Sequence, residues 1–265
     1  MSGDAPSIAA DYILHLADNA LVLGQRNAEW CGHGPVLEED IAMANISLDL
    51  IGQARLLYQH AAHLIGGGAT EDTLAYFRDA GAFRNYMLLE LPQHGPLAGT
   101  AAAPRDYATT IVRNFLYSQL MVLVWDALQR SSDGQLAAIA AKSLKEVRYH
   151  LRHSRDWLLR LGDGTPVSQA RTQAAIDHLL PYTQEFWTET PAESAVCAQG
   201  IGADTRALQA QWDAEVDAAL TEATLKRPTG PAYLPRGKEG LHSEHLSYLL
   251  SEMQGLARQH PGATW

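Results

Sequence analysis

The sequence has few of the residues that build disulfide-rich, zinc-binding or membrane-spanning proteins. Its 265 residues include two cysteines, Cys31 and Cys197, which lie far apart and outside any CxxC motif, so neither a disulfide framework nor a zinc cluster is expected. The longest apolar run, Leu120 to Trp125, is far shorter than the roughly 18 residues that span a bilayer. The N-terminus also lacks the basic and apolar segments of a signal peptide. We therefore expect a soluble protein of the cytoplasm.

Positive charge and β-branched residues are also in the minority. There are 20 Lys and Arg against 30 Asp and Glu, a net charge of -10, which repels phosphate backbones and anionic lipid, so neither nucleic acid nor a membrane is an expected partner. Only 9 Val and 10 Ile stand against 41 Ala and 36 Leu. Unbranched side chains lose little rotamer freedom in a helix, so this composition favours an all-α protein.

Apolar residues recur at helical spacing along the chain, with Gly, Pro and Ser between the periodic stretches. The long stretches cover about 7–31, 37–65, 105–129 and 135–161. Shorter helices are expected over about 71–79, 82–90, 166–188, 205–225 and 243–258. Four long helices in two pairs are typical of a four-helix bundle with a crossover. We predict one helical domain, residues 1–265, with helix pairs 7–65 and 105–161, a crossover at 66–104 and accessory helices at 166–258.

Four-helix bundles of this type can hold two irons between a Glu from each of two helices and a Glu-x-x-His from each of the other two. Residues three apart share a helix face, so each long stretch can be tested for that spacing. In the second stretch, Asp49 is followed three residues later by Gly52, which has no side chain to offer. In the fourth, Glu146 is followed by Tyr149 at three residues and His150 at four. Neither stretch contains Glu-x-x-His.

The third long stretch contains no glutamate, because none occurs between Glu90 and Glu146. Apart from Asp106 at its very start, the only acid that it offers is Asp126. The sequence therefore lacks the full set of ligands for a di-iron site. We expect the polar residues of these helices to be tied together by hydrogen bonds or ion pairs instead; they are Asp49, Asp126, Glu146 and His150.

Other motifs carry little chemistry. The sequence has no GxGxxG, Walker, GxSxG or HExxH motif, so nucleotide-binding, serine-hydrolase and zincin functions have no support. The HSEH motif at 242–245 resembles a metal site, but Ser243 is better explained as a helix N-cap, with Glu244 favoured by the helix dipole. Lys238 and Glu239, after Gly237, predict a solvated turn.

Three segments carry a resemblance to a known family. They are LGQRNAEWCGHGPVLEEDIAMANISLDLIGQA (23–54), KSLKEVRYHLRHSRDWLLRLGDGT (142–165) and GLHSEHLSYLLSEMQ (240–254). The chain resembles the PaaC family, the structural subunits of multicomponent ring 1,2-phenylacetyl-CoA epoxidases, over nearly its whole length. The resemblance implies a ferritin-like subunit that has lost its iron ligands and pairs with a related di-iron catalytic subunit.

The resemblance also implies the chemistry of the complex. One oxygen atom of O₂ is added across the aromatic ring of phenylacetyl-CoA, with NADPH electrons delivered by a reductase that holds a flavin and an iron–sulfur cluster. This chain would hold no cofactor, and a small bridging subunit, the reductase and a second copy of the chain are further partners to consider. The positions that match vestigial iron ligands are Glu29, Asp49, Asp126, Glu146 and His150. Of these, Glu29 lies away from the apolar stripe of its helix.

Two other functions stay open at this stage. One is a self-sufficient di-iron oxygenase or ferroxidase with atypical ligands, against which Gly52 and the acid-poor third stretch argue. The other is a helical scaffold unrelated to oxygenation, against which the three matching segments argue. If the chain is a structural subunit, the stretches 37–65 and 105–129 are expected to supply the interface, because both are apolar around more than one face.

Overall fold

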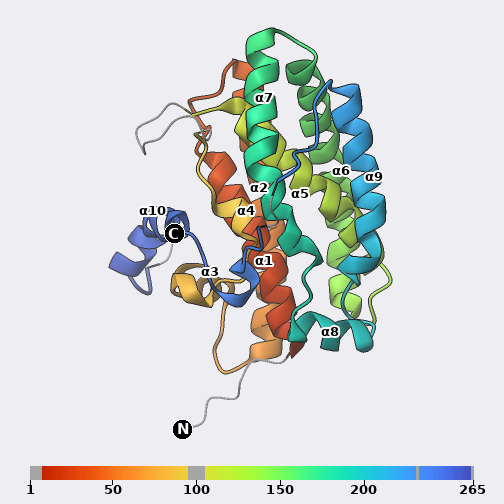
Figure 1. Ribbon diagram of the computed structural model, residues 1–265. Helices are drawn as coiled ribbons and strands as arrows, with labels where there is room; N and C mark the ends of the chain where they lie inside the picture. Colours follow the sequence, from red (N-terminus) through yellow and green to blue (C-terminus); the bar gives the residue numbers. More distant parts are fainter. Residues whose placement is uncertain (1–7, 95–104, 231–232, 264–265) are drawn as a thin grey trace.

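The computed structural model describes residues 8–94, 105–230 and 233–263 (Figure 1). The described part contains α-helices, short 3-10 helices and no strand; its only bridge pairs Arg236 with Leu241. The α-helices are α1 Ile8–Ala28, α2 Leu37–Ile65, α3 Glu71–Tyr76, α4 Met87–Glu90, α5 Tyr107–Leu128, α6 Gly134–Gly162, α7 Pro166–Leu179, α8 Pro191–Ala198, α9 Thr205–Glu222 and α10 Glu244–Gln259. The 3-10 helices are η1 Ala80–Ala82, η2 Leu180–Trp187 and η3 Gly237–Glu239. The all-α prediction is confirmed.

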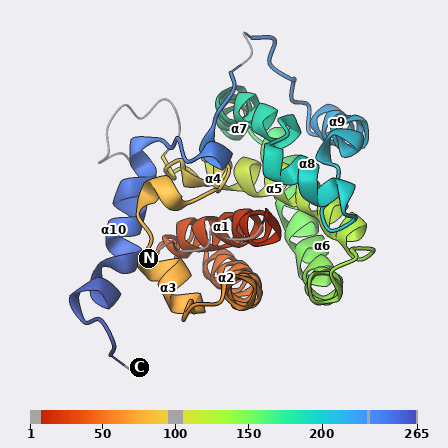
Figure 2. The same ribbon diagram turned by 90° about the horizontal axis from the view of Figure 1, so that it is seen from below.

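Four long helices form the bundle, and the others cover parts of it. Helices α1 and α2 pack along each other, as do α5 and α6. Seen from below, α7, α8 and α9 lie on one side of the bundle, α10 lies at another with α3 and α4, and α2 and α6 lie on the side that faces away from α7 and α9 (Figure 2). This is the ferritin-like four-helix bundle with additional C-terminal helices. None of the described helices is long and apolar enough to cross a membrane.

Helix α5 is the central helix of the protein. It packs against α6, α7 and α9, and none of its residues is exposed; only Tyr107, Val122, Asp126 and Ala127 are even partly so. Its indole and phenyl side chains, Trp125 and Phe115, are fully buried. The prediction that this helix supplies a partner interface is therefore wrong, because α6, α7 and α9 of the same chain already cover its apolar faces.

Several predicted boundaries moved for identifiable reasons. Helix α2 has the predicted ends, but the helix expected over 166–188 changes to 3-10 geometry at η2, where Pro181 has no N–H to donate. Helix α8 was missed, although Thr190, Pro191 and Glu193 form a capping box with proline at the start of the helix. Residues 95–104, the Pro/Gly/Ala-rich end of the predicted crossover, lie outside the described residues.

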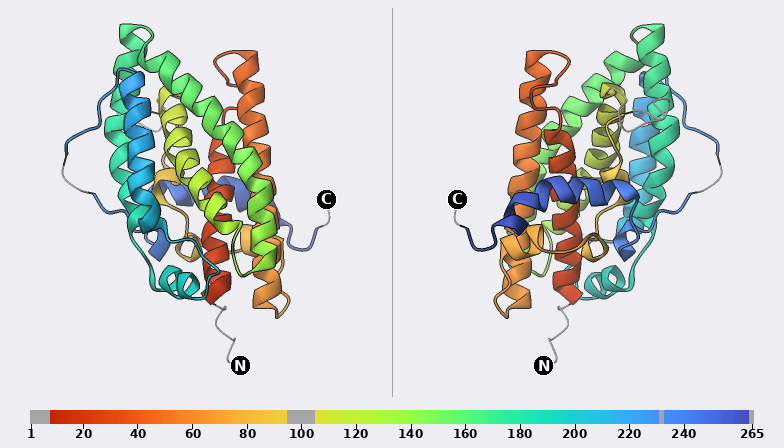
Figure 3. Two further views of the ribbon diagram at one scale, coloured as in Figure 1. Left: turned by 90° about the vertical axis from the view of Figure 1, so that its right-hand side faces the viewer. Right: turned by 90° about the vertical axis from the view of Figure 1, so that its left-hand side faces the viewer.

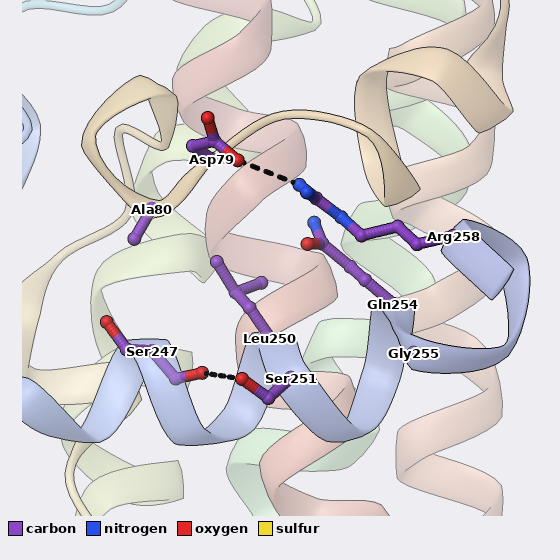
Figure 4. Close-up of a pocket in the computed structure, with 8 residues that line it drawn as sticks. All are labelled: Asp79, Ala80, Ser247, Leu250, Ser251, Gln254, Gly255 and Arg258. Atoms are coloured by element: carbon purple, nitrogen blue, oxygen red, sulfur yellow. Dashed lines mark hydrogen bonds and ion pairs between the residues drawn. The ribbon is translucent and has the colours of Figure 1, made fainter.

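Helix α10 is held against the α3–η1 segment by its own polar side chains. The Gln254 side-chain amide donates to the carbonyls of Ala75 (3.0 Å) and Arg78 (3.1 Å), and Arg258 pairs with Asp79 at 3.1 Å. Figure 4 shows these side chains around a pocket of about 220 Å³, with Leu250 at its centre. Because Gln254 and Arg258 are engaged with the opposite wall, we assign this pocket a packing role.

Candidate functional site

The two helix pairs are joined by a row of polar contacts between α2 and α6, here called the seam. Residues three and four apart share a helix face, so each helix can contribute several side chains to one row. Three imidazoles each donate to a carboxylate across the seam, and one amide does the same. The contacts are His60–Asp133 (2.7 Å), Gln53–Glu146 (2.9 Å), His150–Asp49 (3.0 Å) and His153–Glu39 (2.8 Å).

The seam brings together three of the five sequence-predicted positions. The His150 imidazole, 3% exposed, donates through Nε2 to the carboxylate of Asp49, which is 39% exposed at the outer edge. One turn earlier on α6, Glu146 accepts from the Gln53 amide. These carboxylates come from facing helices, as iron ligands would, but each is already bonded to a side chain of the opposite helix. The expectation that these polar residues would be tied together is confirmed for Asp49 and His150, whereas Glu146 is bonded to Gln53 instead.

The seam does not fit a di-iron carboxylate centre. A Glu-x-x-His pattern needs an imidazole three residues after each acid, where this chain has Gly52 and Tyr149. The Tyr149 ring points outward, 43% exposed, with the Arg152 guanidinium 5.4 Å from its centre. In the part of the chain that the structure describes, no group of three or more His, Cys, Asp and Glu side chains could hold a metal ion.

Another acid of the seam, Glu39, was missed by sequence reasoning. It is buried, and its carboxylate accepts from the Tyr107 hydroxyl of α5 and from His153 Nε2 of α6. Burial raises the pKa of this carboxyl, but hydrogen bonds from Tyr107, His153 and Trp157 outweigh burial and hold the pKa below its ordinary value. In the sequence, Glu39 stands in the first turn of a helix, where the helix dipole is reason enough for an acidic residue. Nothing in the sequence therefore indicated its partners on two other helices.

The other two predicted positions lie outside the seam. Asp126 is half-exposed near the end of α5, where it faces Arg130 at 3.8 Å and Arg148 at 4.0 Å. Glu29 follows the last residue of α1 and forms an ion pair with Arg26. Both carboxylates therefore have cationic partners, and neither contacts the seam. Their descent from iron ligands stays a prediction.

The α1–α5 contact carries neutral side chains where a di-iron bundle needs single carboxylates. Asn27 and Asn114 exchange two amide hydrogen bonds, at 2.8 and 3.1 Å, and Trp30 donates to Thr110 at 2.8 Å. The buried acid of α1, Asp18, accepts from the Tyr58 hydroxyl at 2.6 Å and pairs with a guanidinium of the α3–η1 segment. A reciprocal amide pair satisfies its own donors and acceptors, so it needs no metal.

Comparison with known proteins identifies the family of this chain. The profile of the family described as phenylacetic acid catabolic protein matches residues 2–265. The chain belongs to this family. A protein of Escherichia coli (strain K12) named as a subunit of 1,2-phenylacetyl-CoA epoxidase is 48% identical over 254 residues, which cover 96% of this chain and 98% of that protein.

The chain has a second buried polar cluster, which anchors its C-terminal segment. Lys238 is buried and its ammonium pairs with both carboxylate oxygens of Glu193 at 2.9 Å, so the prediction of a solvated turn is wrong there. Its backbone N–H and that of Met87 donate to Glu185, at 2.8 and 2.9 Å. Burial raises the pKa of Glu185 to about 7, and the two N–H donors oppose that rise.

The HSEH motif of this family member belongs to the same anchor. Ser243 occupies the N-cap position of α10 as predicted, but its hydroxyl makes no capping bond; its N–H donates to Glu90 instead. His242 donates from both ring nitrogens, to Glu90 (2.9 Å) and to the carbonyl of Phe83 (3.0 Å). Burial lowers the pKa of His242, but Glu90 outweighs burial and raises it above its ordinary value. The motif is a structural clamp.

A pocket of about 460 Å³ lies beside this anchor. The polar side chains that line it include His15, Glu193 and Lys238. His15 Nδ1 donates to the Arg84 carbonyl at 2.7 Å, and Lys238 is paired with Glu193. Because these groups are engaged with one another and with the backbone, the geometry gives no reason to assign a ligand here.

Proposed function

We propose that this chain is the structural subunit of a multicomponent oxygenase that epoxidises the aromatic ring of phenylacetyl-CoA in phenylacetate catabolism. It works inside a hetero-oligomer, paired with a related subunit that carries the di-iron centre. The observation that supports this most strongly is the seam: the carboxylates of Asp49 and Glu146 are bonded across the helix interface to His150 and Gln53. The 48% identity to a protein named as a subunit of 1,2-phenylacetyl-CoA epoxidase supplies the substrate class.

The self-sufficient di-iron alternative is not favoured. Two irons need about six protein ligands on four helices, and α5 contributes only Asp126, which faces Arg130 and Arg148. Even if the Asp49–His150 pair broke to bind a metal, only one carboxylate and one imidazole would become available. Because this is too few ligands for two irons, this chain does not activate O₂, and the partner subunit carries out the reaction.

The remaining parts of the complex follow from this assignment. The partner supplies the di-iron centre, and a reductase supplies NADPH electrons through a flavin and an iron–sulfur cluster. This chain holds no cofactor of its own, a small bridging subunit completes the assembly, and the complex works in the cytoplasm. The role of this chain is to keep the catalytic subunit folded, soluble and oriented.

Metal loading tests the assignment directly. The isolated chain and the catalytic subunit are each incubated anaerobically with excess Fe(II), desalted and measured for iron by elemental analysis. We expect about two irons per catalytic subunit and no stoichiometric iron in this chain. A matched Asp49→Asn, His150→Gln double variant should give the same low value as the unmodified chain. Two irons per unmodified chain, lost in the double variant, would contradict the proposal.

A further inference from the structure

Two arginines are buried near the end of α1 and the beginning of α5, here called the arginine pair. Arg113 of α5 is 0% exposed and Arg26 of α1 is 7% exposed. The Arg26 guanidinium donates to the carbonyl of Glu90 at 2.6 Å. The Arg113 guanidinium donates to the next carbonyl, that of Leu91. Gln93 joins the two arginines, because its side-chain oxygen accepts from Arg113 and its side-chain amide donates to the Arg26 carbonyl. Two positive charges therefore share one buried region.

The positive charge of the arginine pair is only partly compensated. Arg26 forms an ion pair with Glu29, whereas Arg113 forms none with any described residue; its acceptors are backbone carbonyls and an amide. Burial and the nearby charge of Arg26 lower the pKa of Arg113 to about 9, and Glu29 opposes this shift. Glu90 is engaged elsewhere, since its carboxylate accepts from His242. A buried charge that lacks a counter-charge is costly, so an anion would be stabilised here.

Each guanidinium also has a donor left over. The Nε atoms of Arg26 and Arg113 are buried and have no hydrogen-bond partner in the part of the chain that the structure describes, although buried polar atoms are nearly always bonded. The chain that continues from His94 carries no counter-charge, because residues 95–104 read GPLAGTAAAP and contain neither Asp nor Glu. An anionic acceptor from solution would satisfy both the charge and the free donors.

Three half-buried histidines stand beside the arginine pair: His94, His178 and His245. The rings of His94 and His245 are 6.5 Å apart. Burial lowers the pKa of His178, and the charges of Arg113 and His94 lower it further. Burial also lowers the pKa of His245, with Arg26 acting in the same direction. A lowered pKa leaves both imidazoles neutral near pH 7, each with one N–H to donate. Because these rings are partly exposed, a solute can reach them.

The five side chains come from five separate segments of the chain. They belong to α1, the residues after α4, α5, α7 and α10. Helix α10 packs on α1 and α4, and α7 packs on α5. The right view of Figure 3 shows α10 crossing in front of α1, with the beginning of α10 on the side of α7; His245 is the second residue of that helix. Donors that converge from several elements are typical of a ligand site.

We propose that the arginine pair and the three histidines form a binding site for a phosphate group. The imidazole N–H groups donate to the phosphate from the solvent side, and the arginine pair supplies positive charge and the free Nε donors from inside. A phosphate suits this arrangement better than a carboxylate, because its oxygens point in four directions and the donors come from five segments. The proposal does not depend on the function proposed above. Its alternative is that the arginine pair only supports the turn at 90–93.

The first test measures phosphate binding by the isolated chain. Inorganic phosphate is titrated in a calorimeter, with the ionic strength held constant by chloride, and we expect one saturable site. The His178→Phe, His245→Phe double variant keeps two aromatic rings but removes their N–H donors, so its Kd should be at least tenfold weaker. The control is His33→Phe with His260→Phe, two exposed histidines elsewhere on the surface, which should bind like the unmodified chain.

The second test removes the buried charge. A ligand that binds only the folded state raises the Tm, so phosphate at 100 times its Kd should raise that of the unmodified chain by about 5 °C. Arg113→Gln should lose this rise, whatever its own stability. Arg171→Gln, at an exposed arginine of α7, should keep it. If Arg113→Gln does not fold, the histidine double variant decides by the same readout.

The third test identifies the source of the phosphate. Coenzyme A, the phosphate carrier of the proposed substrate, is titrated beside pantetheine, which lacks the phosphates and should not bind. Tighter binding of coenzyme A than of inorganic phosphate, lost in the histidine double variant, would assign the site to the coenzyme; tighter binding of inorganic phosphate would assign it to the free anion.

Both of these results support the site. Absence of saturable binding by either ligand, or binding that the histidine double variant retains in full, would overturn the inference and leave the arginine pair as a support of the turn at 90–93. None of these outcomes changes the result expected from metal loading, so the proposed function is judged separately.

Discussion

At the residue scale, the seam shows residues of the types that bind iron in a structural role. An imidazole and a carboxylate that face each other across two helices can either bind a metal or bond to each other. Here His150 and Asp49 are within hydrogen-bond distance at 3.0 Å, with Glu146 held by Gln53 one turn away. The same residue types thus stabilise the contact between the helix pairs. Removing them should lower the free energy of unfolding.

Replacing His150 with Gln tests this role. The flexible amide does not reproduce the rigid ring that holds Nε2 against Asp49, and a buried polar group that loses its partner costs on the order of 1–3 kcal/mol. We expect urea unfolding of His150→Gln to show a decrease of that size, with product formation by the assembled complex nearly unchanged. His63→Gln, an exposed histidine on α2, should change neither. A large loss of turnover at unchanged stability would point to a chemical role for His150.

At the element scale, the sequence predicted helices better than the contacts between them. Helix α2 was predicted at its observed ends because the acids 38–40 favour a helix start and the glycines 66–68 stop it. The pairing of His153 with Glu39 was not predicted, because periodicity shows which residues share a face and not which face of another helix it meets. Lys238 was misassigned for the same reason: its partner Glu193 lies 45 residues away.

The C-terminal segment is the element whose attachment should depend on pH. Burial raises the pKa of Glu185 from 4.5 to about 7, so the folded state binds more protons than the unfolded state between these values. The contribution of this group to stability must therefore fall as pH rises through this window, by up to about 3 kcal/mol, and level off above it. The raised pKa of His242 acts in the same direction, because its stabilisation is present at acid pH and is lost as pH rises through the folded value. The pKa values that burial lowers at His15, His178 and His245 act in the opposite direction.

This dependence can be measured by urea unfolding at pH 5, 6, 7 and 8. We expect the free energy of unfolding of the unmodified chain to fall relative to that of Glu185→Gln over this range, because only the unmodified chain carries a side chain that titrates at this position. Glu215→Gln, on the exposed face of α9, is the control and should keep the full slope. An identical slope in Glu185→Gln would show that another group is responsible.

At the scale of the whole molecule, the polar side chains inside the bundle bond to one another, and aliphatic side chains are exposed on its surface. The interior between the four long helices is closed by side-chain pairs such as Asn27 with Asn114 and Asp49 with His150. The outer face of α2 keeps aliphatic side chains in solvent. Such a chain is suited to an assembly in which a partner buries the exposed apolar area. Obligate interfaces commonly bury about 2,000–5,000 Å² in total.

The central claim is that this chain supports a catalytic partner without doing chemistry itself. The most direct measurement is phenylacetyl-CoA-dependent epoxide formation, followed with NADPH oxidation, by the catalytic subunit and its reductase, with and without this chain. Adding either the unmodified chain or the Asp49→Asn, His150→Gln variant should restore product, with at least a tenfold loss when the chain is omitted. Equal product without this chain, or restoration by the unmodified chain alone and not by the folded variant, would contradict the account.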